Sequence, residues 1–176
     1  YAAVFYSGNR TPTLSDGVVC NGGVAASPCS VSGFPKPGGL PSPNANVQGI
    51  AAPEVGLIVK FDAASGQWRD ELGRDWNNGV RFSLPDLDVF AIDATANPPV
   101  AKGAAFDHVG TTLFNMAVNP VSGKVYVTNT EAHNDVRFGG HTAGFTSVRG
   151  RVVDHRISVL DPSSRGVAAR DLNPHV

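Results

Sequence analysis

The chain has 176 residues, of which 41% are hydrophobic and 16% are charged, and its formal net charge is −1. This length allows one domain with a buried core, whereas the near-zero charge, without runs of Lys and Arg, argues against binding to nucleic acids or anionic membranes. No apolar run approaches the roughly 20 residues of a membrane-spanning helix. The abundant glycine (20) and proline (13) favour short strands joined by turns.

The first expected elements are a short strand at residues 2–6 and a long irregular segment at residues 7–53. Because the segment lacks strand periodicity and is long for a loop, it is predicted to be a surface insertion. It contains Cys20 and Cys29 in the stretch CNGGVAASPC. A disulfide is favoured over two unrelated thiols, since exposed free thiols are a liability, and it would place the chain outside the cytoplasm. A metal pair is disfavoured because no second Cys or Cys/His pair has zinc-site spacing.

Beyond residue 53, one unit recurs three times: a strand that ends in Asp, a turn of small residues and a second strand. The first strands span residues 55–62, 88–93 and 155–161, and the second strands begin at residues 67, 100 and 167. The terminal residues of the first strands are Asp62, Asp93 and Asp161. Each is predicted to accept backbone N–H groups and to close its turn, rather than to act in catalysis.

The most regular pattern lies at residues 113–119 and 124–129, which alternate apolar and polar side chains around a Pro-Val-Ser-Gly turn. It predicts a hairpin with one buried face. Repeated strand–turn–strand modules predict an all-β chain, built as a β-propeller of four-stranded antiparallel blades. In one blade the hairpin supplies strands one and two and the unit from residue 155 supplies strands three and four, so residues 130–154 form an insertion between them.

A propeller blade takes about 40 to 50 residues, so residues 1–176 are expected to form a partial propeller domain of two to three blades with long loop insertions. Other chains or the rest of a longer protein would complete the ring. The abrupt ends of the chain, YAAVFYSGN and DLNPHV, favour a fragment of a longer protein.

The stretch KVYVTN resembles the signature of the YVTN-type β-propeller repeat family. The longer stretches LPDLDVFAID, GTTLFNMAVNPVSGKVYVTNTEAHNDVRF and RISVLDP, the last followed by ARDLNPHV, resemble one subgroup of large secreted or periplasmic bacterial propeller proteins, some associated with di-haem peroxidase-type cytochromes. The resemblance covers residues 80–176 well, residues 54–72 loosely and residues 7–53 not at all. It implies a propeller fold, a periplasmic or extracellular location and a haem protein as one candidate partner. Without a Cys-x-x-Cys-His motif, the chain itself cannot attach a c-type haem by that route.

The densest polar cluster follows the hairpin. Its members are Asn129, Glu131, His133, Asn134 and Asp135. Their carboxylate and amide oxygens are ligands that Ca²⁺ prefers, although the spacing does not match an EF-hand. The alternatives are a contact with a partner, or a polar loop whose side chains bind backbone groups and pair with Arg137. The polar loop is favoured, because a lone cluster is weak evidence for a metal, and no cofactor other than calcium is expected in this segment.

Other candidate residues have simpler explanations. Asp86 and Asp88, in LPDLD, are expected either to cap a turn or to project into a central channel. Residues 66–75, GQWRDELGRD, are expected to form surface ion pairs. The chain has neither a GxSxG motif nor a Walker loop. The scattered histidines, expected to be loop or hydrogen-bonding residues, are His108, His133, His141, His155 and His175.

The function expected from the sequence is that of a non-enzymatic, extracytoplasmic propeller module that binds or scaffolds protein partners or the remaining blades. This expectation rests on two long insertions in a rigid scaffold, at residues 7–53 and 130–154, since inserted loops commonly bind partners. The sequence shows no catalytic constellation beside them. One alternative is an accessory part of a propeller enzyme, either a lactonase-like hydrolase or a haem-linked redox protein. Another is a structural subunit of a surface layer or filament, in which open sheet edges pair with other chains.

Overall fold

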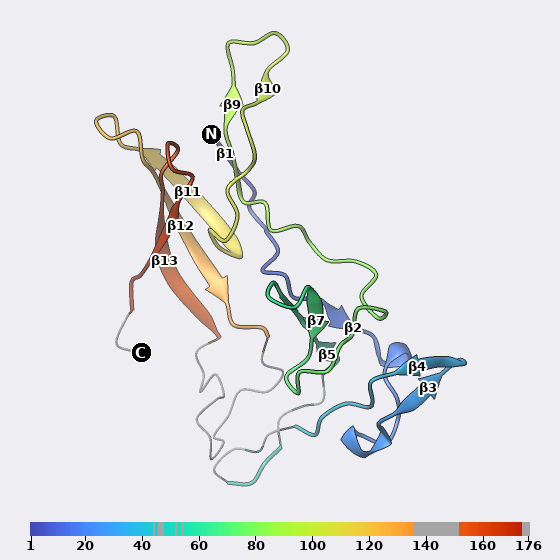
Figure 1. The fold of residues 1–176 in the computed structure, drawn as a ribbon. Helices are drawn as coiled ribbons and strands as arrows, with labels where there is room; N and C mark the ends of the chain where they lie inside the picture. Colours follow the sequence, from blue (N-terminus) through green and yellow to red (C-terminus); the bar gives the residue numbers. More distant parts are fainter. Residues whose placement is uncertain (44, 46–47, 52, 54, 136–151, 174–176) are drawn as a thin grey trace. The chain divides into compact units, whose positions relative to one another are not determined.

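The computed structural model describes residues 1–43, 45, 48–51, 53, 55–135 and 152–173. The chain divides into two compact units (Figure 1). Unit 1 contains Tyr1–Asn9, Leu84–Ala132 and Val153–Val176, and unit 2 contains Arg10–Ser83 and His133–Val152. Across the described ranges, the only helical turns are two short 3-10 helices, η1 (Asp16–Val18) and η2 (Val24–Ala26). The all-β prediction is therefore confirmed, with small antiparallel sheets that do not close on themselves.

Unit 1 contains a four-stranded antiparallel sheet in the order β11-β12-β13-β14. Its strands are β11 (Thr112–Val118), β12 (Val125–Ala132), β13 (Val153–Leu160) and β14 (Val167–Asp171). Figure 1 shows β11, β12 and β13 side by side. The predicted joining of the two hairpins into one sheet is confirmed, whereas its role as a propeller blade stays a prediction.

The expected insertion at residues 130–154 is shorter than predicted at both ends. Thr130, Glu131 and Ala132 continue β12 and pair with His155, Asp154 and Val153 of β13. The pairing continues because each of these residues is compatible with an extended backbone, although the apolar alternation has already ended. Residues 136–151, the middle of the predicted insertion, lie outside the described residues.

One face of the sheet, called the inner face here, forms the core of unit 1. Along β12, Val125, Val127 and Asn129 are buried, while the intervening Tyr126 and Thr128 are exposed. The buried side chains pack with Leu113, Leu160, Val89, Phe106 and Val109. Full burial of a Val or Leu side chain stabilises a fold by about 1.5–3 kcal/mol, so this alternation is enough to fix which face turns inward.

Short strand pairs complete unit 1. β1 (Ala2–Ala3) pairs with β8 (Val89–Phe90), and β9 (Ile92–Asp93) pairs with β10 (Val100–Ala101). Through β1 and β8, the first residues of the chain lie beside the segment that covers the inner face, because Val89 is part of the same core. The N-terminal segment also reaches β11, where Tyr6 forms a bridge with Thr112.

Unit 2 is built from short hairpins and a second core. β2 (Thr13–Leu14) pairs with β5 (Leu57–Ile58), β3 (Cys29–Val31) with β4 (Phe34–Lys36), and β6 (Lys60–Asp62) with β7 (Gln67–Arg69). The core consists of Leu14, Val19, Leu57, Val59 and Trp76. The prediction of a purely surface segment at residues 7–53 is corrected by Leu14 and Val19, which are buried. Their burial does not follow from the sequence, because this segment has no regular alternation of apolar and polar residues.

The predicted disulfide between Cys20 and Cys29 is confirmed, with Cα atoms 6.3 Å apart. It closes a ring across a sequence separation of 9 residues. Cys29 opens β3, and Cys20 forms a bridge with Gly39 beyond β4. The disulfide therefore ties η2 and the β3–β4 hairpin to the residue at which the segment enters the core of unit 2, because Val19 directly precedes Cys20.

The three turn aspartates accept backbone hydrogen bonds as predicted. Asp62 accepts from the N–H of Ala64 at 3.0 Å, and Asp93 from that of Thr95 at 2.9 Å. Asp161 accepts from the N–H of Ser163 at 2.9 Å and also from the hydroxyl of that residue. The hydroxyls of Ser65, Thr95 and Ser163 donate to Asp62, Asp93 and Asp161 respectively. These hydroxyl bonds, and after them the backbone bonds, favour the ionised carboxylates and lower the pKa of all three aspartates.

The turn between β13 and β14 is expected to loosen in acid. The Ser163 hydroxyl, helped by the N–H groups of Ser163 and Ser164, lowers the pKa of Asp161 to about 2 from an ordinary value of 3.8. A lowered folded pKa means that the carboxylate stabilises the turn above the ordinary value and loses this contribution as pH falls toward 2. Hydrogen-exchange protection factors of the Ser163 and Ser164 amides should therefore decrease over that range.

The turn at Asn119 is a matched control for this prediction. Its uncharged side chain accepts from the N–H groups of Val121 and Ser122 at 2.9 and 3.0 Å. Protection of these two amides should not change with pH. An equal loss of protection in both turns would show that acid acts on the whole sheet and not on Asp161.

Candidate functional site

Asp86 and Asp88 both bind the loop of residues 106–110 in unit 1. Asp86 accepts from the N–H of His108 at 3.0 Å, and Asp88 Oδ2 accepts from the N–H groups of Val109 and Gly110 at 2.6 and 3.2 Å. The main chain adds a bond from the Asp88 N–H to the Phe106 carbonyl at 2.8 Å. The structure thus shows the turn-holding role among the two predicted for these aspartates, and a position in a propeller channel stays a prediction.

Asp88 is fully buried, so its carboxylate depends on hydrogen bonds from the protein in place of water. Burial raises its pKa, and the nearby charge of Asp86 acts in the same direction. Ser7, whose hydroxyl bonds the Pro85 carbonyl at 3.4 Å, lies close enough to oppose this rise, as do the two loop N–H groups. Asp86 also faces His108, whose Nε2 is 3.4 Å from its carboxylate.

The inner face of the sheet holds the same loop from the other side. Asn129 Nδ2 donates to Ser158 Oγ at 2.8 Å, and Ser158 in turn donates to the Val109 carbonyl at 2.9 Å. Arg156 Nη2 donates to that carbonyl at 3.1 Å and to the Glu131 carboxylate at 2.9 Å. The loop is therefore bound through its N–H groups by Asp86 and Asp88, which precede β8, and through its carbonyl by β13.

This polar network joins two sets of residues that the sequence suggests separately, Asp86 with Asp88 and Asn129 with Glu131. They meet because the loop reaches the sheet at Gly110, where an added Cβ would lie 2.6 Å from Asn129 Oδ1. Only a glycine allows so close an approach. Arg156 and Ser158 complete the network but stand in an ordinary strand pattern, RISVLD, in which nothing marks them as partners of a distant loop.

The network holds structure together rather than poising a reactive group. Ser158 is fully buried and gives its hydroxyl proton to a carbonyl, so it has no general base. Arg156 neutralises Glu131, with a spacing of 2.9 Å between Nη2 and Oε2. The hydrogen-bonding groups of Ser158 and Arg156 are therefore occupied in holding the loop and Glu131.

The five residues of the predicted calcium cluster are divided between the two units at Ala132. In unit 2, Asn134 Oδ1 accepts from the Thr11 hydroxyl at 3.1 Å and Asp135 pairs with Lys60 at 3.0 Å. The N–H of His133 donates to the Val152 carbonyl at 2.9 Å. Among the described residues, no group of three or more His, Cys, Asp or Glu side chains is placed to hold a metal ion. The contacts match those of a polar loop, and calcium binding stays a prediction.

The remaining candidates are placed as follows. His155 lies on β13 opposite Thr130 and is exposed. Arg137, His141 and His175 lie outside the described residues.

The prediction of surface ion pairs at residues 66–75 is wrong for Asp70, whose side chain is fully buried. Its Oδ2 accepts from Arg74 Nε at 2.6 Å and from Trp76 Nε1 at 2.9 Å. Its Oδ1 accepts from the N–H groups of Leu72 and Arg74 at 3.0 and 2.9 Å. The charges are visible in the sequence, but the packing of Trp76 against them and the bond from Arg74 to the distant Gly39 carbonyl are not.

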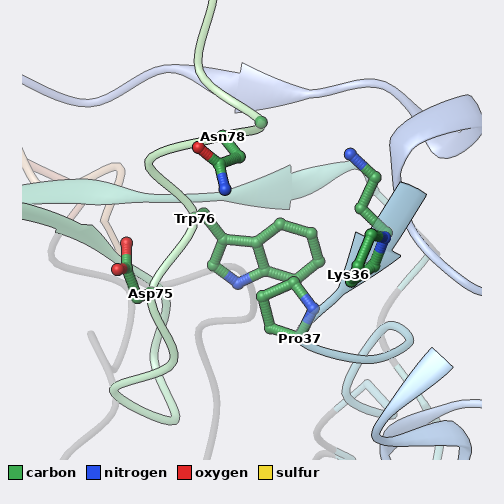
Figure 2. A pocket seen from close by; sticks show the side chains of 7 residues that line it. Lys36, Pro37, Asp75, Trp76 and Asn78 are labelled. Atoms are coloured by element: carbon green, nitrogen blue, oxygen red, sulfur yellow. The ribbon is translucent and has the colours of Figure 1, made fainter. Parts of the chain in front are cut away.

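Unit 2 contains a pocket of about 210 Å³ above Trp76. Figure 2 shows Asp75 and Lys36 on either side of the indole and Asn78 above it. The full lining is Pro35, Lys36, Pro37, Asp75, Trp76, Asn78 and Gly79. No local pattern of the sequence indicates this pocket, because its two walls, FPKP and DWNNG, are far apart along the chain. The only local signal was the turn chemistry of Asn-Asn-Gly.

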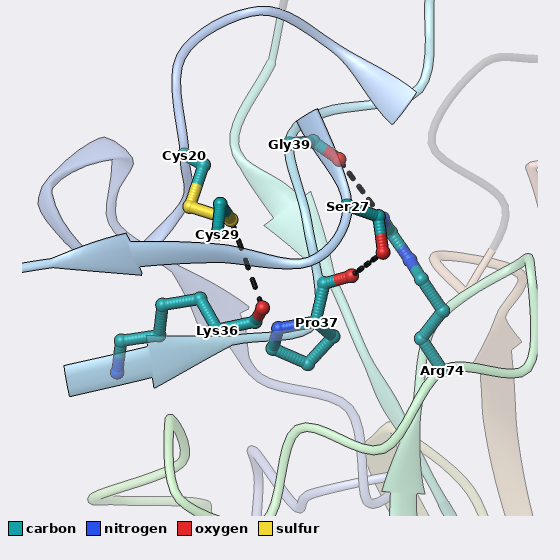
Figure 3. Close-up of a disulfide and its surroundings, with 7 residues drawn as sticks. All are labelled: Cys20, Ser27, Cys29, Lys36, Pro37, Gly39 and Arg74. Carbon is teal, nitrogen blue, oxygen red and sulfur yellow. Dashed lines mark hydrogen bonds between the residues drawn. A yellow bond between two sulfur atoms is a disulfide. The ribbon is translucent and has the colours of Figure 1, made fainter. Parts of the chain in front are cut away.

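The proline wall of the pocket is fixed in place by contacts drawn in Figure 3. The Ser27 hydroxyl donates to the Pro37 carbonyl at 2.6 Å, and Arg74 Nη2 donates to the Gly39 carbonyl at 2.9 Å. Cys29 Sγ contacts the Lys36 carbonyl at 3.6 Å, although a disulfide sulfur carries no proton to donate. The disulfide thus supports the wall through both strands of the β3–β4 hairpin.

No protein-family model matches the chain, and neither a curated protein nor a solved structure was found to be similar to it. The resemblance to YVTN-type propeller repeats therefore stays a prediction from the sequence. The disulfide between Cys20 and Cys29 is compatible with an extracellular or periplasmic location. Within the described part of the chain, no helix is long and apolar enough to cross a membrane.

Proposed function

We propose that the chain is a non-enzymatic, extracytoplasmic β-propeller module that binds and scaffolds other parts of a larger protein or assembly. The observation that carries this proposal is the second face of the four-stranded sheet, called the outer face here. The inner face is covered by residues of the same chain, whereas the outer face presents apolar side chains to solvent.

The outer face carries one row of apolar residues across all four strands. Ala117 pairs with Tyr126, Tyr126 with Val159, and Val159 with Ala168. Tyr126 is 39% exposed, Ala117 and Ala168 are exposed, and Val159 is half-buried. A sheet with apolar side chains on both faces fits a layered architecture in which a second sheet covers the open face. Radial stacking of four-stranded sheets is the arrangement of a propeller.

The polar network supports the non-enzymatic part of the proposal. Its donors and acceptors bind the loop of residues 106–110, so the strongest cluster of functional groups in unit 1 has a positioning role. The disulfide supports export, because such bonds persist in oxidising compartments.

Hydroxyl-radical footprinting tests whether another sheet covers the outer face. Tyr126 should be oxidised readily in the purified chain and at least about five-fold more slowly in the native extracytoplasmic assembly, because burial at an interface core excludes solvent. Phe82, which is 73% exposed in unit 2, serves as a control and should react alike in both samples. Equal oxidation of Tyr126 in both samples would contradict the proposal.

A separate measurement distinguishes the module from a lactonase-like hydrolase. A metal-dependent hydrolase would contain a stoichiometric metal ion and would lose lactone hydrolysis on chelation. Elemental analysis and a lactone assay on the same purified sample decide between the two. A chelator-sensitive activity would overturn the non-enzymatic assignment even if Tyr126 proved to be covered.

A further inference from the structure

The pocket above Trp76 combines available polar groups with a rigid apolar wall. The Lys36 ammonium and the Asn78 carboxamide have no hydrogen-bond or ion-pair partner among the residues that the structure describes. Asp75 accepts from Gln67 Nε2 at 3.1 Å and from the Asn77 N–H at 2.9 Å. Since a carboxylate has about four acceptor sites, its exposed oxygens retain capacity for a ligand.

The charges of the pocket favour a neutral ligand. Lys36 and Asp75 carry opposite charges and lie on either side of Trp76 (Figure 2). An anion attracted by one of them would be repelled by the other, and so would a cation. A hydroxyl group both donates and accepts, so it can bind the ammonium, the carboxylate and the carboxamide alike.

The apolar part of the pocket sets the shape of the ligand. Pro35, Pro37 and Trp76 are its apolar lining; Trp76 is only 1% exposed, and its indole N–H is held by Asp70 at 2.9 Å. These surfaces suit the C–H faces of a saturated ring. The volume of about 210 Å³ is below the roughly 300–1,000 Å³ of pockets for drug-sized ligands, which limits the ligand to one small ring.

We infer that this pocket binds a neutral polyhydroxylated ring, one monosaccharide unit, with Lys36, Asp75 and Asn78 binding its hydroxyl groups and the prolines packing on its C–H face. The disulfide and the bonds from Ser27 and Arg74 hold the wall in place before binding. Little ordering is then needed on association. A site of this size is expected to bind weakly, with a Kd of about 1 mM.

The two tryptophans of the chain allow a direct test by NMR. The ¹⁵N-labelled full chain is titrated to about 100 mM, well above the expected Kd, with the methyl glycosides of D-glucose, D-galactose and D-mannose. The indole N–H resonance of Trp76 should shift and saturate with at least one glycoside, while that of Trp68 stays in place. A Trp68→Phe variant assigns the two signals. Absence of any saturable shift of Trp76 would overturn the inference.

Variants of the pocket distinguish binding there from binding elsewhere. Lys36→Met and Asn78→Ala should each weaken the best glycoside at least five-fold, since each removes one group that binds hydroxyls. Lys102→Met, which removes an exposed lysine from unit 1, should leave the affinity unchanged. Unchanged affinity in both pocket variants would overturn the inference, and so would saturable binding of zwitterionic L-alanine without binding of any glycoside.

Discussion

Asp70→Asn is expected to destabilise unit 2 nearly as much as Asp70→Ala, by about 3–5 kcal/mol. All four acceptor sites of the buried carboxylate are in use, two by backbone N–H groups and two by Arg74 and Trp76. An asparagine would place its NH₂ group against two donors in either orientation. Arg74 would also lose its counter-ion while its side chain remains only 15% exposed.

Urea unfolding followed by tryptophan fluorescence measures this effect, because both tryptophans, Trp68 and Trp76, belong to unit 2. Asp75→Asn is the matched control: Asp75 lies in the same segment but is exposed, so its variant should stay within about 1 kcal/mol of the parent chain. If Asp70→Asn also stays within that range, the hydrogen bonds of the Asp70 carboxylate do not make the expected contribution to the stability of unit 2.

The same substitution at Asp88 should have the opposite outcome. Only Oδ2 accepts the loop N–H groups, and Oδ1 receives no hydrogen bond of good geometry among the described residues. An asparagine oxygen can take the place of Oδ2, so Asp88→Asn retains both bonds and removes a buried charge. At pH 8 this variant should be at least as stable as the parent chain, whereas Asp88→Ala should lose about 2–4 kcal/mol because two buried N–H groups lose their acceptor.

The stability difference between Asp88→Asn and the parent chain should depend on pH. Burial, together with the charge of Asp86, raises the pKa of Asp88 above the ordinary 3.8. Between the two values the folded chain binds more protons than the unfolded chain, so the contribution of this group to stability falls as pH rises. The advantage of Asp88→Asn over the parent chain should therefore shrink as pH falls toward 4. The other titratable groups nearby are Asp86 and His108, which remain in both chains.

Hydrogen exchange at the Val109 and Gly110 amides provides the local measurement. Both amides should keep their protection in Asp88→Asn and lose it in Asp88→Ala. Equal loss in the two variants at pH 8 would show that the charge of Asp88, and not its acceptor oxygen, holds the loop.

The parts of the fold that follow from neighbouring residues were predictable. Alternation at residues 113–119 and 124–129 gave the central hairpin, because burial of one face acts on every second residue. Asp62, Asp93 and Asp161 were placed correctly, since an aspartate binds N–H groups only two or three residues away. The two cysteines were paired correctly because no other cysteine competes.

The parts that depend on distant segments could not be predicted. Asp70 looks like a surface charge until Trp76 and Gly39 cover it. Ser158 and Arg156 differ in no way from other strand residues until the Val109 carbonyl reaches them. The Trp76 pocket needs two segments that are brought together by the disulfide and Arg74. In each case burial, and not residue type, determines the role.

The interleaving of the two units has a consequence for the order of synthesis. β1 pairs with β8, so Ala2 cannot form its strand pairing until Phe90, 88 positions later, has been synthesised. Closing a loop of that length costs on the order of 4 kcal/mol in chain entropy, and at about 5–20 residues per second the ribosome needs several seconds to supply the partner. The segment of residues 10–83, most of unit 2, is complete before then. The N-terminal strand therefore remains unpaired on the nascent chain, while the strands of the disulfide-bearing β3–β4 hairpin can already pair with each other.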